Sequence, residues 1–225
     1  MKRRNLICLI TDRRRLSPES SPEESFDRLV ALVGAASRAG VDLIQLREPD
    51  LPALSLETLA ERCVRASGPT PLLVNDRLDV ALAARAAGIH LRSDSVDAAV
   101  ARMAAGPDFL IGRSVHGVDE AREASHAGAV DYLVFGTVFE TASKSAGHAV
   151  AGVTSLAELC AAVQVPVLAV GGITLDRAPA VAGSGAAGLA AIGLFLPPKD
   201  VPPERHLENT VNALRRVFDT CGVVP

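Results

Sequence analysis

The regular alternation of short apolar runs with helix-like segments most constrains how this chain can fold. The first apolar run, residues 6–11, precedes a segment, 25–38, whose apolar residues recur at helical spacing, and the chain closes with a helical stripe over 204–220. We count eight such pairs. Strict alternation favours a parallel sheet closed into a (β/α)₈ barrel, with an open doubly wound sheet as the alternative. The prediction is an α/β fold: a single TIM-barrel domain over residues 1–225.

Composition narrows the classes of partner. The chain has 225 residues and a net charge of −3, and its longest basic run is Arg13-Arg14-Arg15, so nothing indicates a nucleic-acid-binding face. No apolar span of about 20 residues is present, which argues against a membrane segment and for a cytoplasmic protein. We therefore expect a small-molecule ligand. Alanine-rich helices are compatible with a homodimer.

Residues that directly follow the strands of a closed barrel share one rim. Here they are polar, charged or glycine. The set comprises Asp12, Arg47, Asn75, Asp76, Arg113, Ser114, His116, Thr137, Gly171, Gly172 and Gly193. We expect these residues to converge, although they are far apart along the chain.

Glycines end the last two predicted strands, at Gly171-Gly172 and at Ile192-Gly193. Loops at these places in barrels often bind phosphate through backbone amides, and glycine lets the backbone approach a ligand closely. The structural alternative is that Gly171 and Gly172 only permit a tight turn.

The sixth predicted strand runs into a long polar loop that contains Thr141, Ser143 and Lys144. Hydroxyl and ammonium groups in such a loop suit an anionic ligand, and Arg47 adds a second cation to the same rim. Arg47 alternates with Gln45 in an otherwise apolar strand, which favours a binding role over surface salt bridging.

His116 lies four residues beyond Gly112 and is expected to lie over the rim. Imidazole accepts and returns protons near neutral pH, which suits a proton transfer between carbon atoms, although a lone histidine is more often structural. Asp76 and Asp94 could hold Mg²⁺ through carboxylate oxygens. The alternatives are surface salt bridges, or a helix cap in the case of Asp94.

An ordered set of motifs spans most of the chain. It consists of Ile10-Thr-Asp12, Gln45-Leu-Arg-Glu48, Asn75-Asp76, Gly88-Ile-His-Leu91, Gly112-Arg-Ser-Val-His116, Asp131-Tyr-Leu-Val-Phe-Gly136, Phe139-Glu-Thr141 to Lys144, and Gly171-Gly-Ile173. In these motifs the chain resembles the thiamine phosphate synthase superfamily. The resemblance implies a (β/α)₈ barrel that handles thiazole phosphate.

The family has two enzymatic branches. Synthases join an aminopyrimidine diphosphate to thiazole phosphate and release pyrophosphate, using Mg²⁺ held by two aspartates. Their pattern has a lysine where this chain has Pro49 and an aspartate where it has Ser95. Asp76 therefore lacks its usual partner unless Asp94 takes that place through a one-residue shift.

The second branch comprises TenI-like thiazole tautomerases, which aromatise a thiazole carboxylate phosphate. Its signature is similar to Ser114-Val-His116 with Phe139-Glu-Thr141, where synthases usually have Phe-Pro-Thr. The resemblance makes His116 the proton shuttle. It assigns the binding of substrate and phosphate to Thr141, Ser143, Lys144 and the amides of Gly172, Ile192 and Gly193. We expect Arg47, Asn75, Ser114 and Gly171 to bind substrate or phosphate as well.

We therefore expect a thiazole tautomerase that needs no cofactor. The alternative is a thiamine phosphate synthase that uses Mg²⁺. A third hypothesis is a non-catalytic regulatory protein that binds thiazole phosphate.

Overall fold

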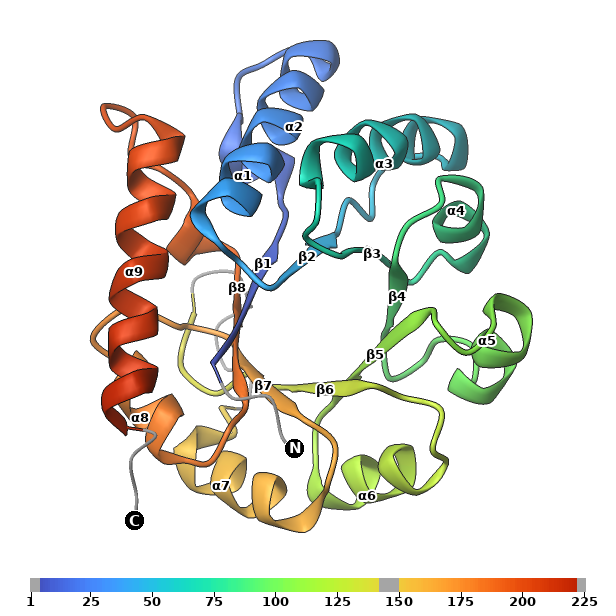
Figure 1. Cartoon of the computed structure of the whole chain (residues 1–225), viewed down its shortest axis with the longest axis vertical. Helices are drawn as coiled ribbons and strands as arrows, with labels where there is room; N and C mark the ends of the chain where they lie inside the picture. Colours follow the sequence, from blue (N-terminus) through green and yellow to red (C-terminus); the bar gives the residue numbers. More distant parts are fainter. Residues whose placement is uncertain (1–4, 142–149, 222–225) are drawn as a thin grey trace.

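Eight parallel strands form a closed barrel in the computed structural model, which describes residues 5–141 and 150–221. Each strand pairs with the next along the chain, and the last pairs with the first (Figure 1). The strands are β1 (Leu6–Ile10), β2 (Leu43–Leu46), β3 (Leu72–Asn75), β4 (Gly88–Leu91), β5 (Leu110–Val115), β6 (Tyr132–Phe135), β7 (Val167–Val170) and β8 (Gly188–Ala191). The predicted TIM barrel is confirmed.

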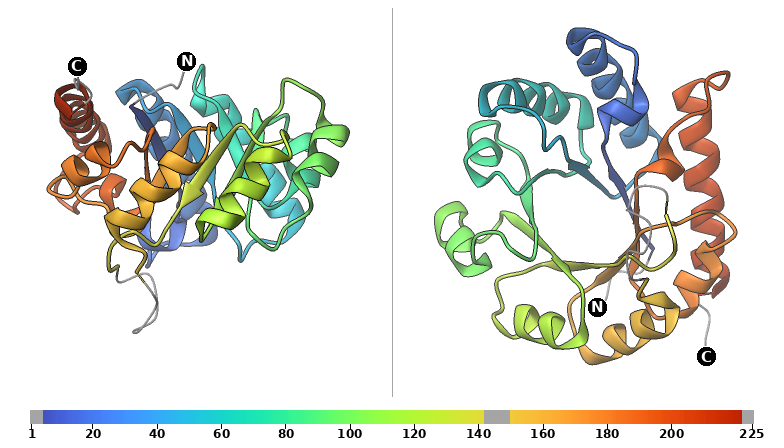
Figure 2. Two further views of the ribbon diagram at one scale, coloured as in Figure 1. Left: turned by 90° about the horizontal axis from the view of Figure 1, so that it is seen from below. Right: turned by 180° about the vertical axis from the view of Figure 1, so that it is seen from behind.

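Helices surround this barrel and cover its outer face, as the two views in Figure 2 show. They are α1 (Arg13–Leu16), α2 (Pro22–Ala39), α3 (Ala53–Ser67), α4 (Leu78–Ala83), α5 (Ala98–Ala105), α6 (Val118–His126), α7 (Gly152–Ala162), α8 (Ala178–Gly183) and α9 (Pro203–Cys221). A short 3₁₀ helix, η1 (Gly193–Phe195), follows β8. Helix α1 was not predicted, because a single turn carries no apolar period.

Local sequence signals explain where the longest early helix begins and ends. Ser21 and Glu24 form a reciprocal capping box before α2, and Pro22 occupies its first turn, where no amide hydrogen is needed. The helix ends at Gly40, which adopts the left-handed conformation with φ 88°. One face of α2 then packs on the barrel through buried residues such as Leu29 and Leu32.

Two apolar layers hold the fold together. The larger lies between strands and helices, and the smaller fills the lumen with Cys8, Ile10, Leu43, Leu73, Tyr132, Val134, Leu168 and Ala190. Lumen-facing residues alternate with helix-facing residues along each strand, as the pleat requires. The ring of ribbons in Figure 1 therefore encloses packed side chains below the carboxyl ends of the strands.

Strand β5 extends further than the sequence indicated. Its apolar run ends at Gly112, but the strand continues through Arg113 and Ser114 to Val115, because these residues pair in register with β6. Ser114 thus belongs to a strand, and His116 directly follows it.

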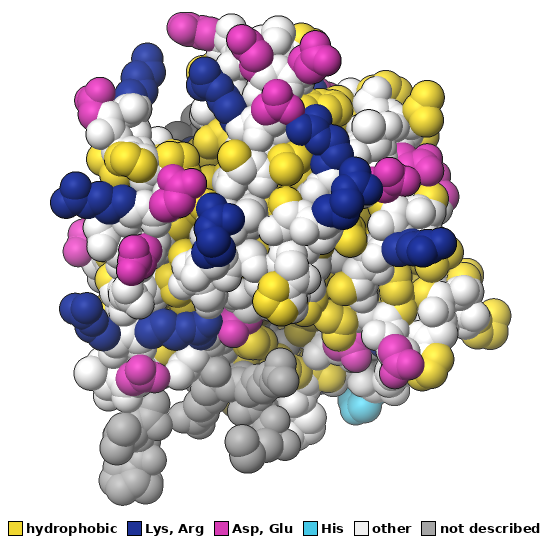
Figure 3. All heavy atoms as spheres, turned by 45° about the horizontal axis from the view of Figure 1, so that its top comes forward, with side chains coloured by type: hydrophobic (Ala, Val, Ile, Leu, Met, Phe, Trp, Pro, Cys, Tyr) yellow, Lys and Arg dark blue, Asp and Glu magenta, His cyan; other side chains and the backbone are white. Residues whose placement is uncertain are grey.

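On the face shown in Figure 3, the described residues form no extended basic patch, and acidic and basic side chains are interspersed. Among the described residues, no helix is both long enough and apolar enough to cross a bilayer.

Candidate functional site

All described residues that the sequence predicted to bind substrate lie at the carboxyl ends of the strands. Asn75 ends β3, Ser114 lies near the end of β5, and the remaining described residues follow their strands directly or within a loop. Because the strands are parallel, these ends form one mouth. Ser143 and Lys144 lie outside the described residues.

One arc of the mouth, from β2 to β5, is polar. Gln45 Nε2 donates to Asn75 Oδ1 at 3.1 Å, and His90 Nε2 lies 2.9 Å from Ser114 Oγ. Gln45 and His90 are buried, whereas Asn75 and Ser114 are partly exposed toward the mouth. The partly exposed members can therefore offer an amide and a hydroxyl to a ligand.

The lumen wall next to the mouth is apolar along the opposite arc, from Val134 in β6 round to Ile10 in β1. Val134 and Ile10 belong to the lumen cluster, Val170 and Ile192 pack against it, and none of the four has a side-chain hydrogen-bonding group. The mouth thus has two chemically different sides. A flat heteroaromatic ring fits this division, with its carbon edge on one side and its polar edge on the other.

His116 is exposed at the end of β5, and its Nδ1 lies 3.0 Å from the carbonyl oxygen of Gly136. A carbonyl can only accept, so Nδ1 carries the proton and Nε2 is the lone-pair nitrogen of the neutral ring. The backbone amide of His116 donates to Glu120 Oε2 at 2.7 Å. This arrangement leaves Nε2 able to take up a proton.

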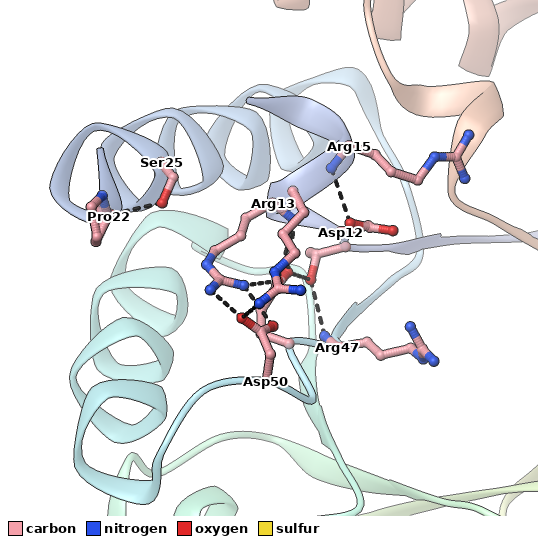
Figure 4. A network of polar contacts seen from close by, with 10 residues as sticks. Asp12, Arg13, Arg15, Pro22, Ser25, Arg47 and Asp50 are labelled. Carbon is pink, nitrogen blue, oxygen red and sulfur yellow. Dashed lines mark hydrogen bonds and ion pairs between the residues drawn. The ribbon is translucent and has the colours of Figure 1, made fainter. Parts of the chain in front are cut away.

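A buried carboxylate joins the loops after β1 and β2. Glu48 is 4% exposed and accepts from Thr11 Oγ1 at 2.7 Å and from Arg13, which also pairs with Asp50. Burial raises the pKa of Glu48, and the bonds from Thr11 and Arg13 oppose this effect. In Figure 4 Arg13 and Asp50 lie together, while the side chain of Arg47 extends away from them.

The backbone of Arg47 is held by this cluster, because its amide donates to Thr11 Oγ1 at 2.9 Å. Its side chain is exposed and forms no hydrogen bond or ion pair with the described part of the chain. A fixed backbone with an uncommitted guanidinium is the arrangement expected of an anion-binding arginine.

Asp76 follows β3 with φ 63°, a conformation uncommon for a residue with a side chain. Its carboxylate accepts from the Ser95 hydroxyl and lies 3.6 Å from the Arg92 guanidinium. Asp94 instead pairs with Arg92 at 2.5 Å. Position 95, not 94, therefore faces Asp76, and the one-residue shift that would bring Asp94 to this carboxylate is not seen.

The double glycine after β7 is required by packing. Both residues have positive φ, 98° for Gly171 and 64° for Gly172. A Cβ on Gly172 would lie 2.4 Å from the carbonyl oxygen of Glu140, so the loop after β6 rests directly on this turn. Arg177 bridges the two loops by donating to Gly172 O at 2.7 Å and stacking over Phe139 at 5.0 Å.

At the end of β8, Ile192 and the exposed Gly193 lead into η1. A Cβ on Gly193 would lie 3.1 Å from Nη2 of Arg15, so the guanidinium of Arg15 lies directly over this glycine. Figure 4 shows Arg15 extending from α1 away from the ion cluster. Thr141, in the loop after β6, is partly buried.

The sequence reasoning missed Arg13, Arg15, Glu48, Tyr132 and Arg177. The signal for Tyr132 and Glu48 was present, because both are polar residues in or beside apolar strands, as Gln45 and Arg47 are. Arg15 and Arg177 lie outside the strands, and only the packed loops reveal their contacts.

The fold and the mouth define a (β/α)₈ barrel with polar and cationic groups at the carboxyl ends of its strands, the usual location of active sites in this class. Residues 8–195 match the family model described as thiamine monophosphate synthase. The chain therefore belongs to this family.

Individual relatives agree with this assignment. A thiamine-phosphate synthase of Roseiflexus castenholzii is 40% identical over 86% of this chain and 82% of its own length. A putative thiamine-phosphate synthase of Geobacter sulfurreducens is 41% identical over 88% of this chain and 90% of its own length. A solved thiamine phosphate pyrophosphorylase from Pyrococcus furiosus superposes with a TM-score of 0.78 at 30% identity, covering 98% of each chain. These names favour the synthase alternative over the expected tautomerase.

Proposed function

We propose that this protein is a thiamine phosphate synthase, which joins hydroxymethylpyrimidine diphosphate to thiazole phosphate. The observation that carries the proposal is the presence of cations at two separate places on the mouth. Arg47 and Arg92 follow β2 and β4, whereas Arg15 lies over Gly193 after β8. Two places suit two phosphorylated substrates, and the names of the relatives support the same reaction.

In this reaction the bond between the pyrimidine methylene carbon and the diphosphate oxygen breaks, and the oxygen keeps the electron pair. The thiazole nitrogen then donates its lone pair to the methylene carbon, forming the carbon–nitrogen bond and releasing pyrophosphate. Arg47 stabilises the charge that develops on the leaving group. Asn75 and Ser114 orient the pyrimidine, while the apolar arc with Ile192 packs against the thiazole.

The residues present fit a magnesium ion that is held jointly with the diphosphate. Asp76 places a partly exposed carboxylate on the mouth beside the Ser95 hydroxyl, and Mg²⁺ is commonly bound by one or two carboxylates plus phosphate oxygens. No cluster of three or more acidic, histidine or cysteine ligands exists within the described ranges, which argues against a protein-only cage. When bound, the ion would neutralise charge on the diphosphate.

The direct test is to incubate the purified protein with both substrates and Mg²⁺ and to measure thiamine phosphate and pyrophosphate. We expect equimolar products, and we expect Arg47→Gln to lower kcat/KM by about 100-fold, as for loss of one oriented donor to a developing charge. Arg38→Gln is the matched control, because Arg38 is an exposed arginine on α2 that pairs at 3.6 Å with Glu204. Absence of both products would contradict the proposal.

One observation favours the tautomerase as a second candidate. The contact with Gly136 places the proton of a neutral His116 ring on Nδ1, which leaves Nε2 as the nitrogen that can accept a proton. The thiazole carboxylate phosphate tautomer, offered without the pyrimidine, tests this function. Isomerisation that is lost in His116→Asn would support the tautomerase, whereas synthase turnover that His116→Asn leaves unchanged would support the synthase alone.

A further inference from the structure

Three polar side chains form a continuous hydrogen-bonded chain over the adjacent strands β4, β5 and β6. The Tyr132 hydroxyl lies 3.1 Å from His90 Nδ1, and His90 Nε2 lies 2.9 Å from Ser114 Oγ. Tyr132 and His90 are 4% and 2% exposed, so only Ser114 reaches the mouth. The chain therefore links a buried phenol to a hydroxyl that a ligand can touch.

The backbone between them makes this contact possible. In the sheet register, Gly112 pairs with His90 on one side and with Tyr132 on the other. A Cβ on Gly112 would lie 2.1 Å from Tyr132 Cζ, so the absence of a side chain there lets the tyrosine ring lie across β5 and reach His90. The rings of His90 and Tyr132 are 5.7 Å apart.

The positions of the protons follow from counting donors. Within residues 5–141 and 150–221, His90 Nδ1 is the hydrogen-bond partner of the Tyr132 hydroxyl. A neutral phenol whose single proton is buried must donate it, so Nδ1 accepts. The proton of the neutral imidazole then lies on Nε2 and is donated to Ser114 Oγ. The opposite tautomer would leave the buried tyrosine proton without an acceptor.

We propose that Tyr132 and His90 are positioning residues that make the Ser114 hydroxyl a directed hydrogen-bond donor toward the mouth. Because Ser114 Oγ already accepts from His90, its own proton is free to point at a substrate acceptor. This proposal rests on the proposed function for the identity of that acceptor, an oxygen or ring nitrogen of the pyrimidine diphosphate. Burial lowers the pKa of His90 to about 3, so the imidazole stays neutral at physiological pH.

The tautomer is measurable without substrate. Two-bond ¹H–¹⁵N correlation spectra of the ¹⁵N-histidine-labelled full-length protein distinguish a protonated ring nitrogen from an unprotonated one. The His90 signals are identified by their absence from His90→Gln. We expect a protonated Nε2 and an unprotonated Nδ1 at both pH 6 and pH 9, whereas a protonated Nδ1 would overturn the proposal. This result does not depend on which reaction the protein catalyses.

A double-mutant cycle tests whether Tyr132 acts through Ser114. We expect Tyr132→Phe to lower kcat about 10-fold and Ser114→Ala to lower it about 100-fold. If Tyr132 acts only through the serine, the double variant should equal Ser114→Ala. If the reductions in kcat of the two single variants multiply in the double variant, the proposal is wrong.

Two further variants separate positioning from packing. His90→Gln keeps one donor and one acceptor and should retain more activity than His90→Leu, whereas equal activities would contradict the role assigned to His90. Ser184→Ala is the control for loss of a buried hydroxyl, because Ser184 bonds Val181 O at 2.7 Å beside α8, at the end of the barrel opposite the mouth. It should leave kcat unchanged. If neither the wild type nor any variant forms thiamine phosphate, the proposed function is wrong. The tautomer of His90 still tests the positioning role in that case, because it is measured without substrate.

Discussion

At the scale of single residues, one cation contacts two acids whose pKa values are shifted in opposite directions, because burial outweighs the effect of the cation at one of them. Arg13 contacts both Glu48 and Asp50, but the pKa of Glu48 is raised by burial, whereas hydrogen bonding to Arg13 lowers the pKa of Asp50 from 3.8 to about 2. The sequence showed that Arg47 alternates with Gln45. It could not show which acid accepts from which arginine, because that choice depends on two loops meeting.

The shift at Asp50 predicts acid sensitivity. Below pH 3.8 the unfolded chain binds the Asp50 proton before the folded protein does, so stability is lost as pH falls toward 2. Asp50→Asn should remove this part of the pH dependence, measured by urea unfolding between pH 2 and 5. Arg13→Gln should remove most of it, because only the ion pair of Asp50 with Arg14 at 2.9 Å then remains. If the stability of Arg13→Gln depended on pH as steeply as that of the wild type, Arg13 would not be the cause of the lowered pKa of Asp50.

At the scale of elements, periodicity predicted the order of the eight strands but not all of their limits. The polar residues Arg113 and Ser114 ended the apolar run, yet pairing with β6 keeps them in β5. Helix α1 was missed because four residues carry no period. Local pattern thus predicts which elements form, while their ends depend on partners distant in sequence.

Close strand contacts make one glycine in β8 essential for barrel closure. A Cβ on Gly188 would lie 1.9 Å from the carbonyl oxygen of Leu6 in β1, and backbone cannot move aside as a side chain can. We expect Gly188→Ala to reduce the free energy of unfolding by at least about 2 kcal/mol. Gly183→Ala, in α8 with no atom within 4 Å of the added carbon, should instead be neutral or stabilising by up to about 1 kcal/mol. Equal stability of both variants in urea would contradict this account.

At the scale of the whole molecule, the C-terminal helix closes the fold. Helix α9 packs beside α2 and α8 (Figure 1). Arg215 donates to Asn5 O, to Gly40 O at 2.8 Å and to Asp42 Oδ2 at 2.7 Å, at the amino-terminal end of β1. The sequence predicted the helix and its apolar side, but not this contact between the last helix and the first strand.

The contacts of Arg215 should contribute to stability but not to activity. We expect Arg215→Gln to lower the free energy of unfolding by about 1–3 kcal/mol, because it removes charge-assisted bonds that join distant segments. Its kcat should not change, because the mouth is at the other end of the strands. Arg216→Gln alters the adjacent, exposed arginine and should leave thermal unfolding unchanged. A loss of kcat in Arg215→Gln at temperatures where it remains folded would show that the two ends are coupled.

The division of the lumen wall into a hydrogen-bonding arc and a hydrocarbon arc constrains how a planar ligand is oriented. A ligand turned end for end in its own plane would place its heteroatoms against Val134, Val170 and Ile192, where their lost hydration is not replaced. The alternation of residues along eight short strands thereby selects one of the two end-for-end orientations of the ring.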